Sequence, residues 1–161
     1  MFAVFSNFLL LLGSVYLGIG ERAIDLAVEA AHYRTSRSTG NRPFADDVQI
    51  RDIVARMGLR QMNARVALEA TARDVDKLAE HGAEWFPRLT GAKLHATQAA
   101  RRTVEEALEV VGGSSFRAGH ELSRLYRDVA ASVYHPSQDR SVRATYAQWL
   151  LGPIGATHPD A

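Results

Sequence analysis

The stretch EVVGGSSFRAGHELSRLYRD, residues 109–128, contains the end of one helix, a glycine turn and the start of another helix. Gly112 and Gly113 end the first helix, because glycine readily adopts the backbone conformation that closes a helix C-terminus. Beyond the turn, apolar residues return at steps of one, three and four, which predicts a helix that buries one face. These residues are Leu122, Leu125, Tyr126 and Val129. We therefore predict helices over residues 92–111 and 121–133.

Two longer helices precede this segment, and a shorter one follows it. Residues 2–37 and 45–80 carry apolar side chains at the spacing of amphipathic helices, and residues 140–151 form a third such run. In residues 45–80 we expect one inward stripe, made of Ile50, Val54, Met57, Ala64, Leu68, Val75 and Leu78. Gly82 is the expected stop of that helix. The following loop, residues 81–91, places Trp85 and Phe86 over one end of the bundle.

The predicted fold class is all-α, because no run alternates apolar and polar residues with the period of a strand. Long helices joined by short connections favour an antiparallel, up-down-up-down bundle of four main helices, here with a short fifth helix at the C-terminal end. We expect residues 1–152 to form one helical domain and residues 153–161 to form a flexible tail.

Composition excludes several classes of function. The 161 residues carry a formal net charge of +1, so no strong field favours nucleic acid or an anionic membrane as a partner. The absence of cysteine excludes disulfides and thiolate metal sites, and fits a cytoplasmic location. The six histidines show no metal-ligand spacing, so no metal site is predicted. The general motifs for nucleotide binding and for a serine nucleophile are also missing.

The first twenty residues are apolar and contain no charged side chain. A membrane span needs about 20 continuous apolar residues, but Ser6, Asn7, Gly13 and Ser14 interrupt this run. The pattern continues directly into an amphipathic helix after Glu21. We therefore interpret the segment as the buried half of one long helix, with a membrane segment as the alternative.

Residues 109–128 resemble the acyl-CoA dehydrogenase superfamily, whose C-terminal helical domain has a Gly-Gly turn followed by a Leu-(Tyr/Met)-Arg-Asp helix. Here these elements are Gly112-Gly113 and residues 125–128, LYRD. Residues 133–139, VYHPSQD, stand where the family has its Tyr-Glu-Gly-Thr turn, and Arg34 stands where the family has an arginine at the end of a first helix. The resemblance covers about residues 13–151.

This resemblance implies a flavin cofactor, FAD or a reduced flavin such as FMN, shared across a subunit interface. Arg34 would pair with the pyrophosphate, and Ser36 would add a hydroxyl donor. Gly112 and Gly113 would allow the backbone to approach the adenosine part, while Ser137 and Asp139 would lie near the flavin of their own subunit. The implied partners are N-terminal and β domains, or a partner subunit that supplies them, within a homo- or hetero-oligomer such as a homotetramer. No nucleic acid and no membrane are expected as partners.

The catalytic position departs from the dehydrogenase pattern. The family's carboxylate stands in the Tyr-Glu-Gly-Thr turn, where this chain has His135, or on the first helix, where the first twenty residues contain no Asp or Glu. Histidine at this turn resembles the flavin-dependent monooxygenase branch of the superfamily, which has the type-2 C-terminal domain. Because imidazole titrates near neutral pH, His135 is the candidate catalytic base or hydrogen-bond donor.

Three alternatives stay open, two for single residues and one for the whole chain. His135, next to Pro136, can simply cap a helix start, and Arg34 can serve as a dipole partner for the end of its own helix. The chain as a whole can be a non-catalytic oligomerisation module or a relic of the family. Whether or not His135 is catalytic, the chain alone is expected to be an incomplete catalyst.

Overall fold

The structure, a computed structural model, describes residues 2–37 and 40–155. Over these ranges the chain forms five α-helices and no strand, and its only bridge of the β type joins Thr35 to Pro43. The helices are α1 (Phe2–Tyr33), α2 (Val48–Asp76), α3 (Trp85–Val111), α4 (Glu121–Ala130) and α5 (Asp139–Leu151). The all-α prediction is confirmed, whereas most of the predicted tail, residues 156–161, lies outside the described residues.

A short 3-10 turn lies in each of the four connections between these helices, and several predicted helix ends are shifted. These turns are η2 (Phe44–Asp46), η3 (Gly82–Glu84), η4 (Gly112–Phe116) and η5 (Ala131–Val133). The prediction that Gly82 ends the second helix was wrong, because α2 closes earlier, at Lys77 and the left-handed Leu78. Trp85 and Phe86 are helical rather than part of a loop, since Pro87 falls in the first turn of α3, where no backbone donor is needed.

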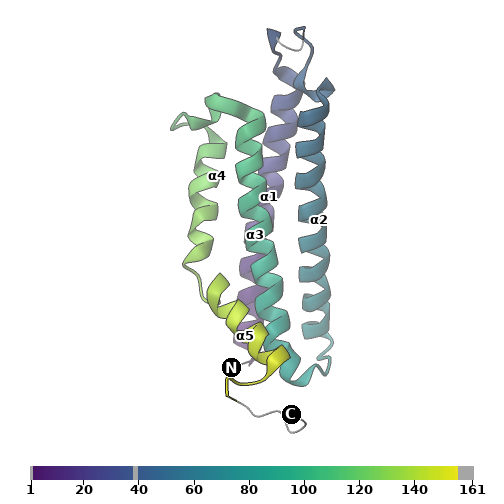
Figure 1. The fold of residues 1–161 in the computed structure, drawn as a ribbon, viewed down its shortest axis with the longest axis vertical. Coiled ribbons are helices and arrows are strands. Elements are labelled where there is room, and N and C mark those ends of the chain that lie inside the picture. The colour runs from purple at the N-terminus through teal and green to yellow at the C-terminus, as the bar shows by residue number, and fades with distance from the viewer. Residues whose placement is uncertain (1, 38–39, 156–161) are drawn as a thin grey trace.

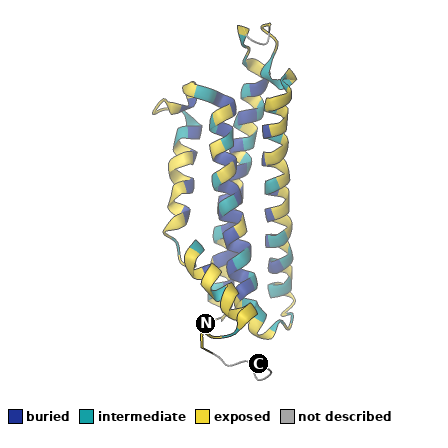
Figure 2. Cartoon of the chain, viewed as in Figure 1, coloured by how far each residue is buried: buried dark blue, intermediate teal, exposed yellow. Residues whose placement is uncertain are grey.

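The main helices lie side by side, with α1 and α3 in the middle, α2 on one flank and α4 on the other (Figure 1). Successive main helices connect at alternating ends, and α5 crosses the lower half of α3 (Figure 1). Buried residues concentrate on α3 and on the sides of its neighbours that face it (Figure 2). Helix α3 is therefore the scaffold against which the rest of the chain packs.

The core divides into two clusters along the bundle. One centres on Met57, Val104 and Leu122, near the start of α2 and the end of α3, and the other on Leu9 and Leu89, near the start of α1 and α3. Two residues of the predicted inward stripes are in fact exposed, Leu78 by 81% and Tyr126 by 46%. Leu78 lies beyond the last turn of α2, and Tyr126 lies outside the buried face of α4, which consists of Leu122, Leu125 and Val129.

Helix α1 is long and apolar enough to cross a membrane by length and composition alone. One face of its first half is nevertheless buried, including Leu9, Tyr16 and Leu17, in contact with both core clusters. The opposite face leaves Val4 and Leu11 exposed. The prediction of a buried half-helix therefore holds for one face only.

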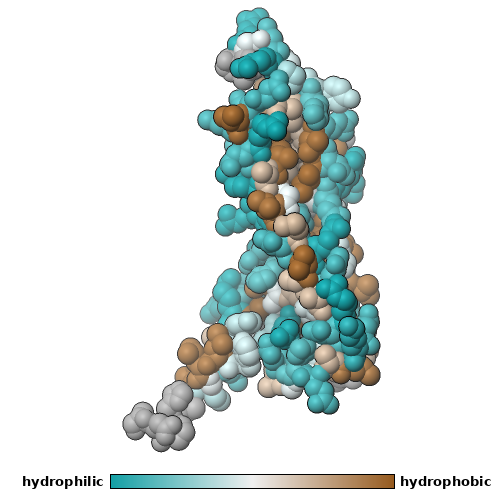
Figure 3. Space-filling model, turned by 90° about the vertical axis from the view of Figure 1, so that its right-hand side faces the viewer, coloured by the Kyte–Doolittle hydropathy of each residue, from teal (hydrophilic) through white to brown (hydrophobic). Residues whose placement is uncertain are grey.

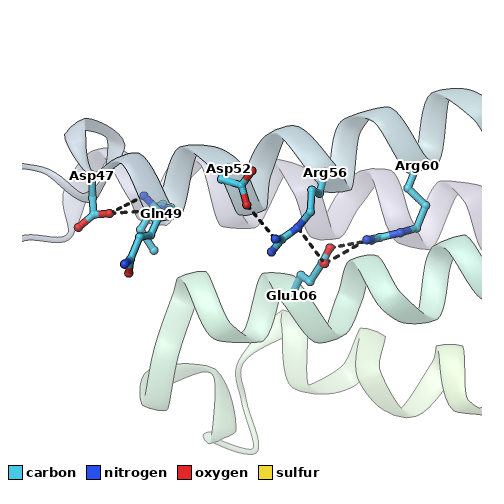
Figure 4. A network of polar contacts seen from close by, with 7 residues as sticks. Asp47, Gln49, Asp52, Arg56, Arg60 and Glu106 are labelled. Atoms are coloured by element: carbon cyan, nitrogen blue, oxygen red, sulfur yellow. Dashed lines mark hydrogen bonds and ion pairs between the residues drawn. The ribbon is translucent and has the colours of Figure 1, made fainter.

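A polar clasp fixes α2 to α3 (Figure 4). The Arg60 guanidinium donates two hydrogen bonds to the Glu106 carboxylate, at 2.6 and 3.0 Å. Arg56 lies between the same carboxylate, at 3.7 Å, and Asp52, at 2.8 Å. Asp47 caps the start of α2 by accepting from the backbone N–H of Gln49 at 2.8 Å. The contacts of Arg60 and Arg56 with Glu106 join α2 to α3, whereas those of Asp52 and Asp47 lie within α2 and its N-terminal cap.

Candidate functional site

The structure brings Arg34 and Gly112 together at the end of the bundle where α1 and α3 finish. The Nη1 of Arg34 donates to the carbonyl of Val110 at 2.7 Å and also to the carbonyl of Val111. Carbonyls in the last turn of a helix have no partner within the helix, so Arg34 caps α3. The hydrogen bonds of the Arg34 guanidinium thus go to α3, and its role as a dipole partner for its own helix stays a prediction.

The guanidinium is also held from the side. Its central carbon lies 4.8 Å from the centroid of the Phe44 ring, a cation–π contact. The backbone N–H of Phe44 donates to the carbonyl of Arg34 at 2.8 Å, which closes the connection between α1 and α2. Ser36 lies in the same connection, and its carbonyl accepts from the N–H of Asn41 at 2.9 Å. Contacts from Phe44 and from the end of α3 thus hold the Arg34 side chain in place.

Gly112 has a conformational reason to be glycine, whereas Gly113 does not. Gly112 has a φ of +70° and a ψ of −163°, a combination that side chains rarely allow. A Cβ at Gly112 would also lie 2.6 Å from Nη1 of Arg34. A Cβ at Gly113 would meet nothing within 4 Å, and this residue is exposed. The side-chain-free surface at Gly113 is open in this chain.

His135 lies in the connection between η5 and α5, where it is half-buried against α1. Its ring contacts the ring of Tyr16 edge-on, with centroids 5.7 Å apart and an interplanar angle of 61°. Tyr16 is only 3% exposed, and burial, followed by the charge of Asp128, raises the pKa of its phenol. The contact joins an imidazole to a phenol that keeps its proton at neutral pH.

Side chains of α3 hold the rest of this connection. The Lys93 ammonium donates to the carbonyl of Ser137 at 3.2 Å. The carboxylate of Asp139 accepts from Gln98 at 2.9 Å and from Arg101 at 3.2 Å. Asp139 is also the first residue of α5, where a negative charge is favoured by the helix dipole. The predicted flavin-side residues His135, Ser137 and Asp139 therefore share one anchored turn, which we call the His135 turn (residues 134–139).

The two groups of predicted residues lie far apart on the same scaffold. Lys93, under the His135 turn, and Val111, beside Arg34, are both on α3. At a rise of 1.5 Å per residue, the helix between them spans roughly 27 Å. The chain thus has a cationic group, Arg34, at the end of α3. The imidazole of His135 lies in the anchored turn, well separated from Arg34. The described residues contain no group of three or more His, Cys, Asp or Glu side chains that could hold a metal ion.

Sequence reasoning did not identify Tyr16, Lys93, Gln98 and Arg101 as part of the site. One signal was available for Lys93, because it shares the buried face of α3 with Leu89, Ala96 and Ala100 at steps of three and four. A lysine on an otherwise apolar or small face indicates a charge with a specific partner. Nothing local in the sequence indicates that Tyr16 would meet His135.

Comparison with known proteins supplies the family. A family model described as "Acyl-CoA dehydrogenase, C-terminal domain" matches residues 10–140. YdbM of Bacillus subtilis (strain 168), a protein classed with acyl-CoA dehydrogenases, is 32% identical over 141 residues, which are 85% of this chain and 35% of that protein. L-evernosamine nitrososynthase of Micromonospora sp. is 32% identical over 128 residues, 74% of this chain and 28% of that protein.

A solved structure extends the likeness to nearly the whole chain. XiaF from Streptomyces sp., in complex with FADH2 and glycerol, matches 97% of this chain and 41% of that chain with a TM-score of 0.85 and 21% identity. At this identity the likeness is one of fold. The chain spans about a third of the length of the curated relatives it matches. From residues 10–140, the chain belongs to the family of acyl-CoA dehydrogenase C-terminal domains, as the Gly-Gly turn and the LYRD helix predicted.

Proposed function

We propose that this chain is the flavin-contacting and oligomerising domain of an acyl-CoA dehydrogenase-like flavin oxidoreductase of the monooxygenase type. Bound flavin would supply the two-electron chemistry, with FAD as the proposed form. The chain would supply His135 at the reacting end and Arg34, Ser36, Gly112 and Gly113 at the phosphate and adenosine end of a cofactor shared between subunits. The observation that carries the proposal is His135, half-buried against Tyr16 in the anchored turn where the family has its carboxylate.

Removal of the α-proton of a thioester substrate by a carboxylate base fits this chain poorly. Residues 131–139 contain a single acid, Asp139, and both Gln98 and Arg101 donate to its Oδ2. This carboxylate is already engaged by two donors of α3, at the start of α5. Histidine is the side chain most often used as a general acid or base, and His135 lies in the same turn. This contrast supports a proton transfer by His135 with an oxygenated or phenolic substrate over dehydrogenation of a thioester.

Arg34 is suited to a phosphate. Both of its hydrogen bonds among the described residues leave from Nη1, while a guanidinium carries five N–H groups in a planar fork. The Phe44 ring and the end of α3 hold that fork in place. Gly113 follows Gly112, the residue beside the Arg34 guanidinium, and its open surface would let the adenosine part approach without meeting a side chain. These features support phosphate binding at the α1–α3 end.

Exposed apolar side chains support the need for partners. Helix α1 exposes Val4, Leu11 and Val15, which lie on one helical face, and α2 exposes Leu59, Met62 and Val66 at steps of three and four. Apolar groups are visible along the α2 side amid hydrophilic ones (Figure 3). Contiguous exposed apolar surface marks an interaction site in a soluble protein. We propose that neighbouring domains and a second copy of this domain cover these faces.

Flavin retention tests the proposal. The chain would be mixed with a candidate partner that supplies the N-terminal and β domains, passed through a gel-filtration column, and read by flavin absorbance. We expect the wild-type mixture to retain flavin and Arg34→Met to reduce retention by about tenfold, the loss expected for one charge-assisted phosphate contact. Arg37→Met, which removes an exposed arginine three residues away, is the matched control and should retain flavin normally.

A second substitution separates binding from chemistry. His135→Asn should retain flavin and lose turnover by a factor on the order of 100 to 10,000, the range for a removed general acid or base. If no mixture retains flavin yet the chain still forms a defined oligomer, the exposed apolar faces would favour the alternative function, a non-catalytic oligomerisation module.

A further inference from the structure

We propose that Lys93 is a positioning residue that holds the His135 turn against α1 and thereby sets where the imidazole lies. This inference rests on the proposed function for the role of His135, but its geometry and its test concern this chain alone. Lys93 is 0% exposed, the largest of the fully buried side chains. Lysine is almost never fully buried without a partner, and here its hydrogen-bond partner is a backbone carbonyl in the turn.

The partner carbonyl belongs to a residue with an unusual backbone. Ser137 has a φ of +60°, in the left-handed region that non-glycine residues rarely adopt. Such a conformation persists only where the surroundings hold it. A hydrogen bond from Lys93 of α3, at 3.2 Å, reaches the carbonyl of this residue. Lys93 therefore fixes the turn at its strained point, two residues from His135.

Helix α3 holds the turn at a second point as well. Gln98 and Arg101 bind the carboxylate of Asp139, which starts α5. On its other side His135 contacts Tyr16 of α1. The segment between these contacts has little freedom left, because both of its ends are tied. Loss of the Lys93 contact would release the middle of the turn while Asp139 still held its end.

Stability alone gives no reason for an amine at this position. Burial lowers the pKa of Lys93, the nearby Asp139 partly offsets this, and Arg101 adds to it. An apolar side chain of similar length in the same place would avoid that desolvation. An amine at this position donates a hydrogen bond to the Ser137 carbonyl and so positions the turn, whereas methionine has no donor. If Lys93 served only packing, Lys93→Met would leave the turn unchanged. If Lys93 positions the turn, Lys93→Met would release it.

Nuclear magnetic resonance on the flavin-free chain tests the proposal. In the wild-type chain we expect nuclear Overhauser contacts between the Tyr16 and His135 rings. In Lys93→Met these contacts should be lost and the Ser137 carbonyl carbon should shift, while the thermal midpoint stays equal or rises. Lys77→Met is the matched control, since it removes the other lysine of the chain, which is exposed on α2's C-terminal cap, and it should leave both signals unchanged. Lys93→Arg keeps a cationic donor and should restore the ring contacts.

Two outcomes would overturn the proposal. One is a folded Lys93→Met chain with unchanged Tyr16–His135 contacts. The other is a chain that loses its helical circular dichroism with both Lys93→Met and Lys93→Gln, since Lys93 would then serve the whole bundle. Because the measurement uses no flavin, a failure of cofactor binding would leave its result intact.

Discussion

The α1–α3 end and the His135 turn both place a polar group at an irregular piece of backbone. The two regions stabilise that backbone in different ways. At the first, Gly112 takes a positive φ and Arg34 caps the carbonyls that the helix end leaves over. At the second, Ser137 takes a positive φ without being glycine, and a buried Lys93 reaches across from α3 to hold it. The first region depends on backbone freedom, and the second on a distant side chain. The turn should therefore be the region that a single side-chain change alters most readily without unfolding the bundle.

The largest expected effect on stability is at the α1–α3 end. Gly112→Ala should lower the free energy of unfolding by about 2 to 3 kcal/mol, the upper part of the range for a side chain forced into a glycine-only backbone region. The strain remains even if the Arg34 guanidinium moves out of the way of the new Cβ. Urea unfolding followed by circular dichroism measures the change.

Gly113→Ala is the matched control for that substitution. Its Cβ meets nothing within 4 Å, and its φ is not positive. We expect a change within about 0.5 kcal/mol of zero, as for ordinary surface substitutions. Equal losses of unfolding free energy at the two glycines would show that the conformational constraint belongs to the whole connection between α3 and α4 and not to Gly112 alone.

A smaller effect, visible only with pH, is expected at the His135 turn. The pKa of Lys93 is lowered in the folded chain from its ordinary value of 10.5. At a pH between the folded pKa and 10.5, the unfolded chain therefore binds more protons than the folded chain. The free energy of unfolding should therefore rise with pH in that window, by at most about 1.4 kcal/mol per pH unit for one proton. Burial is the main cause of the lowered pKa of Lys93; the charge of Asp139 opposes it, and the charge of Arg101 adds to it.

The measurement compares wild type with Lys93→Met between pH 8 and pH 10. Stability of the wild type relative to Lys93→Met should increase across that range, while wild type and Lys77→Met should run parallel. A difference between wild type and Lys93→Met that stays constant with pH would contradict the assignment of a lowered pKa to this amine.

The smallest effect is expected at a surface pair that ties α1 to α4 between the two regions. Arg22 donates to both oxygens of Glu121, at 3.0 and 2.7 Å, and this hydrogen bond is the main cause that lowers the pKa of the Glu121 carboxyl. A lowered carboxyl pKa contributes stability above the ordinary value of 4.5, and that contribution is lost as pH falls through the folded value.

Arg22→Gln should therefore reduce the thermal midpoint slightly at pH 7, and the difference from wild type should shrink at pH 3 and in high salt, which screens exposed charges. A difference that grows on acidification would contradict this account of the pair.

The sequence by itself determined that five helices form, though not the end of α2 or the start of α3, and it determined the glycine stop at Gly112 and the family. Helical periodicity follows from residues three or four apart, and the stop follows from backbone conformation. The sequence also placed His135 in a turn. Only the tertiary structure decided that Arg34 caps α3, that Tyr16 meets His135 and that Lys93 is buried beneath Ser137. These contacts join residues on different helices, so they depend on the rotation and register with which α1, α4 and α5 pack on α3, which no local pattern in the chain specifies.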